Sequence, residues 1–257
     1  MNPTGSTILI TGGGSGIGEA LAHRFHDAGN HVIVAGRRQD ALDRAIAGRA
    51  NMSAMTLDIE DPQAIATFAR EVVAAHPALN VLVNNAGIMR DETIDRASDV
   101  HVAEDTITTN LLGPIRLTNA LIDQLTAQPD AAIVNVTSGL AYVPLTLTPT
   151  YCATKAAIHS YTVSLRELLR GRVEVMELVP PGVQTDLTPG QANRPGYMPL
   201  PEFIDEVMAL FTQTPTPPEV LVERVRPLRF AEAEGQFEQR LTGLNAMARK
   251  AREGAVG

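Results

Sequence analysis

Short apolar runs, rich in β-branched residues, alternate along this chain with longer stretches whose apolar residues recur at helical spacing. Some of the short runs are continuously apolar, which is typical of strands buried on both faces of a parallel sheet. Runs of this kind predict strands at 6–11, 31–35, 53–57, 79–85, 131–138 and 173–179. The stretches between them predict helices at 16–28, 39–48, 62–75, 98–112, 114–127 and 149–170. Repeated strand–helix–strand units predict an α/β fold in a single domain, with one parallel sheet between two layers of helices.

The last third of the chain has a different composition. Residues 180–201 contain six prolines, which is too many for a continuous helix or a central strand. We interpret 183–225 as a loop region, or lid, over a substrate site, with short helices near 201–212 and 217–224. Residues 226–257 are charged and predict a helical tail with a frayed, Gly-rich end.

Composition and charge exclude several classes of protein. The chain has 257 residues, 44% of them hydrophobic, and a formal net charge of −8. This acidic balance, without a basic run, argues against nucleic acid as a partner. The chain has no long apolar run and no basic region of a signal peptide, so we expect a cytoplasmic protein without a membrane span. The single cysteine, Cys152, excludes an intramolecular disulfide, and the six histidines lack metal-ligand spacing, so we expect no metal.

A glycine-rich segment, TGGGSGIG at 11–18, lies between the first predicted strand and the first predicted helix. Glycine allows a sharp turn and a close approach of the backbone, and the N–H groups at a helix N-terminus favour an anion such as a pyrophosphate. A strand–turn–helix unit of this kind at the start of a parallel sheet indicates a doubly wound, Rossmann-type fold that binds a dinucleotide. The residues expected to contact the dinucleotide here are Gly12, Gly14, Ser15, Gly16, Ile17 and Gly18.

The end of the second predicted strand bears on the choice of dinucleotide. An NAD site usually has Asp or Glu about 20 residues after the glycines, where it binds the ribose 2′-hydroxyl. Here the strand ends at Ala35, and Arg37 and Arg38 follow it without a carboxylate. Two guanidinium groups suit a 2′-phosphate, so the sequence favours NADP(H) over NAD(H). The alternative is a surface arginine pair that only caps the next helix.

Three residues further along the chain have the chemistry of a catalytic site. Tyr151 and Lys155 are four residues apart on a predicted helix and therefore share one face. An ammonium about 4 Å from a phenol would favour the phenolate by about 4 kcal/mol at an effective dielectric constant of about 20, which moves the pKa of the phenol into the catalytic range. Ser138 ends the fifth predicted strand, at the sheet edge where ligands bind in open α/β folds. Its hydroxyl can bond to the same substrate oxygen as Tyr151.

At these positions the chain resembles the short-chain dehydrogenase/reductase family. The matching motifs run in order between 6 and 186: TGGGSGIG (11–18), Asp58, NNAG (84–87), Asn110, Ser138, YCATK (151–155) and Pro181-Gly182. PPGVQTDL (180–187) and LVERVR (221–226) also resemble a bacterial subgroup of oxidoreductases named after a lipoteichoic-acid operon. The tail departs from the family pattern because it lacks the common last strand that ends in Asp-Gly-Gly.

The resemblance implies a role for each matched residue. Tyr151 would be the acid/base, Lys155 would lower its pKa and hold the nicotinamide ribose, and Ser138 would orient the substrate carbonyl. Asn110 would support a water relay to Lys155. The further cofactor contacts that the resemblance implies are Asp58 at the adenine, Asn84, Ala86 and Gly87 in the cofactor cleft, Pro181 and Gly182 after the sixth predicted strand, and Val183 and Thr185 at the carboxamide.

Together these features predict an NADP(H)-dependent oxidoreductase that transfers a hydride between nicotinamide and the carbonyl or secondary alcohol of a small, largely apolar substrate. Leu140, Val143 and Leu145 are candidates for lining the substrate pocket. We expect a homo-oligomer, either a dimer or a tetramer, with neither nucleic acid nor a membrane as partner. The alternatives are the same chemistry with NAD(H) and a nucleotide-binding sensor without catalysis.

Overall fold

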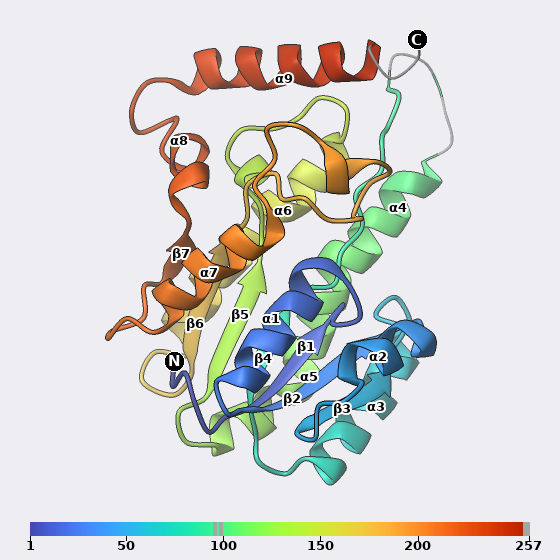
Figure 1. The fold of residues 1–257 in the computed structure, drawn as a ribbon, viewed down its shortest axis with the longest axis vertical. Coiled ribbons are helices and arrows are strands. Elements are labelled where there is room, and N and C mark those ends of the chain that lie inside the picture. The colour runs from blue at the N-terminus through green and yellow to red at the C-terminus, as the bar shows by residue number, and fades with distance from the viewer. Residues whose placement is uncertain (95–96, 98–99, 254–257) are drawn as a thin grey trace.

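A parallel β-sheet forms the centre of the structure (Figure 1). The computed structural model describes residues 1–94, 97 and 100–253. Within these residues the sheet has seven strands in the order β3-β2-β1-β4-β5-β6-β7, and all neighbours are parallel. The strands are β1 (Thr7–Thr11), β2 (His31–Gly36), β3 (Met52–Thr56), β4 (Leu79–Asn84), β5 (Ala132–Val136), β6 (Glu174–Val179) and β7 (Glu219–Leu221). The strand order reverses between β1 and β4, and a crevice for ligands forms at such a point, beyond the carboxyl ends of the strands.

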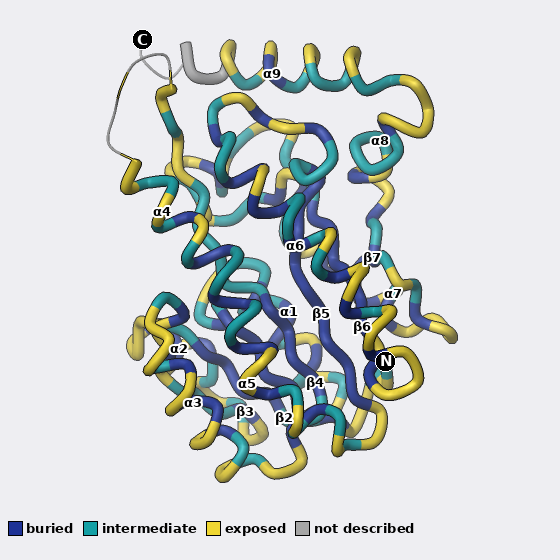
Figure 2. Tube along the Cα trace, turned by 180° about the vertical axis from the view of Figure 1, so that it is seen from behind, coloured by how far each residue is buried: buried dark blue, intermediate teal, exposed yellow. Residues whose placement is uncertain are grey.

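Helices cover both faces of the sheet, so that the strands are buried and the outer sides of the helices are exposed (Figure 2). The helices are α1 (Gly16–Asp27), α2 (Gln39–Ile46), α3 (Pro62–Ala75), α4 (His101–Ile107), α5 (Gly113–Ala127), α6 (Pro149–Leu168), α7 (Leu200–Phe211), α8 (Arg226–Arg229) and α9 (Phe237–Glu253). Apolar residues of α1, α2 and α7 pack on one face of the sheet, and those of α3, α5 and α6 pack on the other.

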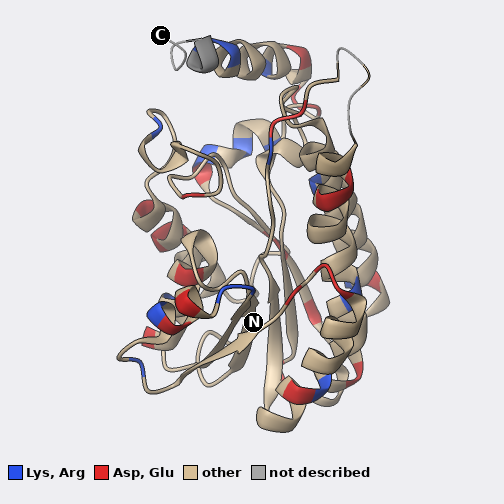
Figure 3. Cartoon of the chain, turned by 90° about the vertical axis from the view of Figure 1, so that its right-hand side faces the viewer, with Lys and Arg blue, Asp and Glu red and all other residues tan. Residues whose placement is uncertain are grey.

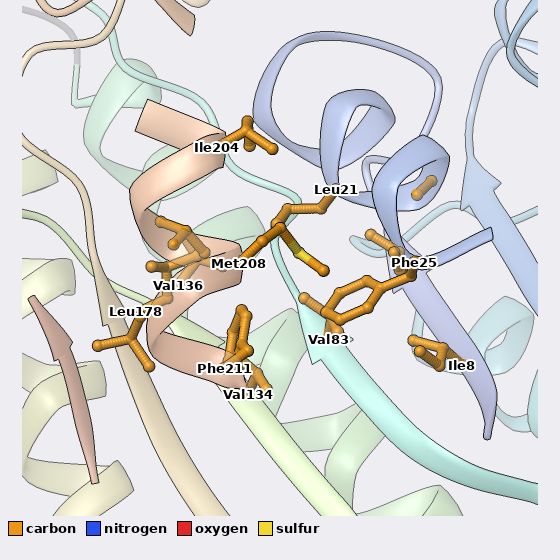
Figure 4. Packing of buried hydrophobic residues seen from close by; sticks show 14 of the residues in the cluster. Ile8, Leu21, Phe25, Val83, Val134, Val136, Leu178, Ile204, Met208 and Phe211 are labelled. Carbon is orange, nitrogen blue, oxygen red and sulfur yellow. The ribbon is translucent and has the colours of Figure 1, made fainter. Parts of the chain in front are cut away.

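Each strand supplies apolar side chains to both faces of the sheet, because successive side chains of a strand point in opposite directions. In β1, Ile8 and Ile10 belong to the core with α1 and α7, whereas Leu9 belongs to the core of the opposite layer. In the first core the rings of Phe25 and Phe211 lie 5.6 Å apart between their centroids (Figure 4). Because both faces of the sheet are buried, the strand sequences are continuously apolar.

The fold class predicted from the sequence is confirmed. All six predicted strands are present, and their ends lie within two residues of the expected ones. The helix expected over 98–112 is α4 followed by a π-helix at Thr108–Leu112. Residues 98 and 99 of that prediction lie outside the described part of the chain.

The helix predicted at 217–224 is wrong, because this segment contains β7 and then a short 3₁₀ turn at Glu223–Val225. Pro217 and Pro218 cannot donate helical hydrogen bonds, and each disfavours the helical conformation in the residue before it. Val220 is fully buried in the strand that pairs with β6. β7 lies before the tail and does not end in Asp-Gly-Gly.

Charged residues lie mainly on the outer helices and loops, and the sheet between them is largely free of charge (Figure 3). Across the described ranges, no helix combines the length and the hydropathy that a bilayer crossing would require.

Replacing Phe211 by Ala should lower the free energy of unfolding by about 3–5 kcal/mol, because it removes a buried ring from the core between α1 and α7. Urea denaturation followed by circular dichroism measures this change. Met247→Ala, at a side chain that is 67% exposed, is the control and should leave the unfolding midpoint unchanged. A loss below about 1 kcal/mol in Phe211→Ala would contradict this packing.

Candidate active site

The glycine-rich turn after β1 forms one side of the site. Gly12 has a positive φ of 66°, and its N–H donates to the carbonyl of Ala35 in β2 (2.7 Å). The turn lies so close to the start of α1 that a Cβ on Gly18 would be 2.4 Å from the carbonyl oxygen of Gly12. Ser15, the N-cap of α1, makes no side-chain hydrogen bond to the first turn of that helix. A helix N-terminus that is left without a side-chain cap suits an anion.

Asn85 and Thr11 hold this turn against the end of β4. The Nδ2 of Asn85 donates to the carbonyl of Thr11 (2.9 Å), and the Oγ1 of Thr11 accepts from the N–H groups of Asn85 (3.0 Å) and Ala86 (3.1 Å). A Cβ on Gly12 would lie only 2.9 Å from the Nδ2 of Asn85. Asn85 was not among the residues expected at the site, although it is the second Asn of NNAG.

The side chain of Asn84 points in the other direction. It is 4% exposed, and its Nδ2 donates to the Oγ1 of Thr118 in α5 (3.1 Å) and to the Oδ1 of Asn135 in β5 (2.8 Å). Of the NNAG residues, Asn85 and Ala86 therefore contact the glycine-rich turn, while Asn84 ties β4 to its neighbours inside the fold.

Arg37 and Arg38 follow β2 at the same edge of the sheet. Arg37 is half exposed, and its Nη1 lies 3.3 Å from Oε1 of Glu60. Arg38 is exposed and is the N-cap of α2, where its carbonyl accepts from the N–H of Leu42 (3.1 Å). Asp58, exposed beyond β3, accepts through its Oδ1 from the N–H of Glu60 (3.0 Å). Glu60 is thus a partial counter-charge to Arg37 that the sequence reasoning missed.

The structure brings together Ser138, Tyr151 and Lys155. Ser138 follows β5, where its Oγ accepts from the N–H of Leu140 (3.1 Å) and its side chain is hydrogen-bonded to Tyr151. Lys155 lies one turn after Tyr151 on α6. Its Nζ is 5.6 Å from the centre of the Tyr151 ring and donates to the carbonyl of Val136 in β5 (2.8 Å). The exposed fractions of Ser138, Tyr151 and Lys155 are 7%, 7% and 5%.

Burial governs the protonation of Tyr151 and Lys155. It lowers the pKa of Lys155 to about 8, since the ammonium exchanges water for a backbone carbonyl. It raises the pKa of Tyr151 well above its ordinary value, and the hydrogen bond with Ser138 offsets only part of this effect. Burial is the largest cause of this shift, and the lowering effect of the Lys155 charge on the pKa of Tyr151 stays a prediction. Tyr151 is a protonated acid at neutral pH.

Asn110 lies in the π-helix that follows α4, and its amide is 1% exposed. Its Oδ1 accepts from the N–H of Ile88 and its Nδ2 donates to the carbonyl of the same residue, both at 2.8 Å. A third, longer bond reaches the Oγ1 of Thr154 in α6 (3.4 Å). Asn110 thereby holds the segment after β4 beside α6. In this segment a Cβ on Gly87 would lie 3.7 Å from the Nζ of Lys155.

Tyr151 belongs to an apolar cluster. Its buried members are Leu145, Tyr151 and Cys152, and the partly buried residues packed on them are Met89, Leu140, Leu147, Leu244 and Ala248. Two of the three substrate-pocket candidates, Leu140 and Leu145, therefore belong to the same cluster as Tyr151. The third, Val143, is fully buried.

The loop after β6 closes another side of the site. Val183 is 2% exposed and forms an isolated parallel β-bridge with Met198. Gly182, which follows Pro181, approaches Tyr197 so closely that a Cβ would lie 3.1 Å from its ring. Thr185 accepts through Oγ1 from the Nε2 of Gln191 (3.2 Å). Tyr197 was not found from the sequence, because its proximity to Gly182 depends on the path of a proline-rich loop.

A buried carboxylate, Glu177, lies behind the Ser138 turn. Glu177 is in β6 and is fully buried. Its Oε1 accepts from the hydroxyls of Thr137 (2.7 Å) and Tyr142 (2.9 Å), and its Oε2 lies 2.7 Å from the Nδ1 of His159. Burial alone would raise the pKa of Glu177, but the hydrogen bonds from His159 and Thr137 hold it below its usual value. The same hydrogen bond raises the pKa of His159.

Glu177 therefore connects the two elements that carry the catalytic residues. Thr137 immediately precedes Ser138, and His159 is one helical turn beyond Lys155 on α6. Glu177, in the middle of the otherwise apolar run from Val175 to Val179, was the sequence signal for this network.

His159, Glu177 and Glu219 also offer nitrogen and oxygen atoms that lie within 4.8 Å of one another. Both carboxylate oxygens of Glu219 already accept from Arg229, at 2.7 and 2.8 Å. Arg229 thus pairs with Glu219, and His159 with Glu177, so side chains of the protein occupy this cluster.

The match to known proteins agrees with this geometry. The sequence pattern of the short chain dehydrogenase family matches residues 6–195, so the chain belongs to the short-chain dehydrogenase/reductase family. It is an oxidoreductase of the NAD(P)-dependent kind. The match ends before α7, α8 and α9.

Two relatives and one solved structure illustrate the similarity. The chain is 41% identical over 198 residues to the uncharacterized oxidoreductase DltE of Bacillus subtilis (strain 168), covering 76% of this chain and 79% of the relative. It is 34% identical to the NADPH-dependent 1-acyldihydroxyacetone phosphate reductase of Schizosaccharomyces pombe, covering 70% of this chain but only 60% of that protein. A short chain dehydrogenase from Burkholderia cenocepacia J2315 has the same fold, with a TM-score of 0.81, 24% identity, and coverage of 94% and 99%.

Replacing His159 by Leu should lower the free energy of unfolding by about 3–5 kcal/mol, because it leaves the carboxylate of Glu177 buried without its cationic partner. Urea denaturation at neutral pH measures the loss. Asp205→Asn, which removes an exposed partner of Arg24, is the control and should leave the midpoint unchanged.

The contribution of the His159–Glu177 pair to the free energy of unfolding should also decrease as the pH rises through the raised pKa of His159, since the imidazolium then loses its charge. A His159→Leu variant as stable as the wild type at neutral pH would show that the buried carboxylate does not depend on His159.

Proposed function

We propose that this protein reduces the carbonyl group of a small, largely apolar substrate with NADP(H), and oxidises the corresponding secondary alcohol in the reverse direction. The observation that carries the proposal is the buried set of Ser138, Tyr151 and Lys155 at the carboxyl edge of the sheet. The segment Ala86–Gly87 lies between this set and the glycine-rich turn, in contact with both.

The residues around the turn fit a dinucleotide. At Gly12 and Gly18 the backbone lines the crevice, and a Cβ at either position would collide with neighbouring atoms of the protein. Gly16 faces Thr185 across the crevice, and a Cβ on Gly16 would lie 3.6 Å from the threonine side chain. The residues proposed to hold NADP(H) are Gly12, Gly14, Ser15, Gly16, Ile17 and Gly18 at the pyrophosphate, Arg37 and Arg38 at the 2′-phosphate, Asp58 at the adenine, Tyr151 and Lys155 at the nicotinamide ribose, Val183 and Thr185 at the carboxamide, and Ala86, Gly87, Pro181 and Gly182 along the cofactor cleft. Asn84 supports this crevice from within the fold.

When bound, the nicotinamide supplies a hydride to the carbonyl carbon. Tyr151 donates its hydroxyl proton to the carbonyl oxygen, and the raised pKa keeps that proton in place at neutral pH until the substrate is bound. Ser138 donates a hydrogen bond to the same oxygen and orients it. The ammonium of Lys155 stabilises the phenolate that remains on Tyr151. Asn110 keeps the backbone of Ile88 in place beside these groups.

The preference for NADP(H) rests on Arg37 and Arg38, which follow β2 where an NAD site usually has a carboxylate. The fission yeast relative is NADPH-dependent by name. The pair between Arg37 and Glu60 favours the alternative, the same chemistry with NAD(H), because it neutralises part of the charge that a 2′-phosphate requires.

The surroundings of Tyr151 support an apolar substrate, since Met89, Leu140 and Leu145 are among its neighbours. We further propose a cytoplasmic homo-oligomer. Exposed apolar side chains on α6, Val163 at 45% and Leu168 at 70%, offer a surface for a second copy, and a free thiol at Cys152 suits a reducing compartment.

Tyr151→Phe should lower kcat for carbonyl reduction by about 10²–10⁴-fold, because the ring still packs but the proton donor is lost. NADPH oxidation across a panel of aldehydes and ketones measures the rate, and NADPH fluorescence should show unchanged cofactor binding. Tyr161→Phe, on the same helix, is the matched control and should keep full activity.

A Tyr151→Phe variant as fast as the wild type would overturn the mechanism. A wild type that binds NADPH tightly but turns over no carbonyl compound would instead favour the sensor without catalysis.

Arg37→Ala should weaken NADPH binding about tenfold and leave NADH binding unchanged, because it removes a charge-assisted hydrogen bond to the 2′-phosphate. Glu60→Gln should have the opposite effect, since it frees Arg37 from its counter-charge. Titration of both cofactors by fluorescence measures the two dissociation constants. Equal or tighter binding of NADH by the wild type would contradict the choice of NADP(H).

A further inference from the structure

Glu177 lies on the face of the sheet that α6 covers. Val175, two residues earlier in β6, packs in the core with α3, α5 and α6, and alternate side chains of a strand share a face. The carboxylate is fully buried there, where a charge costs free energy unless neighbouring groups pair with it. The motifs that the chain shares with its family do not include Glu177. Its hydrogen bonds show which parts of the site it holds.

One oxygen of this carboxylate holds both ends of the turn that carries Ser138. Oε1 accepts from the hydroxyl of Thr137 (2.7 Å), directly before Ser138, and from the hydroxyl of Tyr142 (2.9 Å), four residues after it. A short 3₁₀ turn, Gly139–Ala141, lies between the two donors. The carboxylate therefore bridges the turn from one end to the other.

The segment 225–229, which contains α8, encloses the same turn from the other side. A Cβ on Gly139 would lie 2.8 Å from the side chain of Leu228 and 2.9 Å from that of Val225. The guanidinium of Arg229 lies 4.7 Å from the centre of the Tyr142 ring. The turn is thus held between the α8 segment and Glu177.

The second carboxylate oxygen joins the turn to the helix that carries Tyr151 and Lys155. Oε2 of Glu177 lies 2.7 Å from the Nδ1 of His159. His159 comes four residues after Lys155 and therefore lies on the same face of α6. Glu177 thereby sets the position of the turn relative to α6.

The position of the turn determines where the Ser138 hydroxyl lies. Its Oγ accepts from the N–H of Leu140 inside the turn (3.1 Å) and is hydrogen-bonded to Tyr151. A turn that moved away from α6 would carry Ser138 and this N–H with it. A displacement of about 1 Å at a reacting group can cost on the order of 10²-fold in rate.

We propose that Glu177 is a positioning residue for Ser138. Its carboxylate, held against α6 by His159, keeps the turn 138–142 where the Ser138 hydroxyl reaches the substrate oxygen beside the acid of the reaction. Glu177 does not touch the substrate. This inference rests on the proposed carbonyl reductase function and adds to it the residue that sets the hydrogen bond from Ser138.

The first test removes each hydrogen bond to Oε1 of Glu177 separately, in Thr137→Val and Tyr142→Phe. Each variant should lower kcat with NADPH about tenfold, because Ser138 is displaced, and should leave the dissociation constant of NADPH unchanged. Tyr161→Phe, on α6, is the matched control and should keep the wild-type kcat. Wild-type kcat in both Thr137→Val and Tyr142→Phe would overturn the proposal.

A second comparison separates positioning from a merely structural role. Tyr142→Phe should lower kcat by less than about twofold when Ser138 is already replaced by Ala, because the hydroxyl that Glu177 positions is then absent. The same tenfold loss with and without the Ser138 hydroxyl would show that the network does not act through Ser138.

The carboxylate itself is tested by two substitutions of Glu177. Glu177→Gln keeps an acceptor for both hydroxyls and gains an amide that donates to a neutral His159, so kcat should stay within about threefold of the wild type. Glu177→Leu removes the acceptor and should lose at least as much kcat as Tyr142→Phe. Equal kcat in the two variants would contradict the role of Glu177.

The last test does not depend on turnover. The chain has four tyrosines, so labelling with ¹³C at the tyrosine Cζ gives four NMR signals, which Tyr→Phe variants assign. Thr137→Val should shift the signal of Tyr151 in the same direction as Ser138→Ala does, and should leave the signal of Tyr161 unchanged. An unshifted Tyr151 signal in Thr137→Val would overturn the link between Glu177 and Ser138. A shifted signal in a protein that reduces no carbonyl compound would support this link and count against the proposed function.

Discussion

The buried ammonium of Lys155 is the interaction on which the site depends. It donates to the carbonyl of Val136 (2.8 Å), and this bond ties α6 to the end of β5 one helical turn beyond Tyr151. Since Ser138 follows the same strand, the bond also fixes the distance between the proton donor and the hydroxyl that orients the substrate. Burying a cation costs free energy unless polar atoms replace its water. Here burial disfavours the charged form of Lys155 and lowers its pKa to about 8.

Two further sets of contacts hold the same elements in place. Glu177 connects the Ser138 turn to α6 from within the sheet, through Thr137 on one side and His159 on the other. Asn245 holds α9 over the loop before α6 and so completes the apolar surroundings of Tyr151. A protonated phenol needs such a water-poor environment to keep a raised pKa and to donate its proton only to a bound carbonyl. The stability of the fold and the chemistry of the site thus depend on the same residues.

The sequence predicted those parts of the molecule that local patterns determine. Strands buried on both faces are continuously apolar. Glycines mark the turn after β1, which has no room for a Cβ at Gly18. Tyr151 and Lys155 share a face because they are four residues apart on one helix. It could not predict β7, because a three-residue strand depends on pairing with β6 more than on its own sequence. Asn85, Glu177 and Asn245 were missed for a related reason, since their partners are distant in the chain. The direction of the pKa shift of Tyr151 also could not be predicted from the sequence, because burial is a property of the assembled fold.

The most direct test of this account is an NMR titration of the protein labelled with ¹³C at the lysine Cε. The chain has two lysines, Lys155 and Lys250, so the spectrum has two signals, which the Lys250→Arg variant assigns. The account predicts that the signal of Lys155 titrates at a pKa of about 8. Titration of Lys155 at about 10.4, the value of a lysine in water, would contradict it, because the ammonium would then not be buried beside Tyr151.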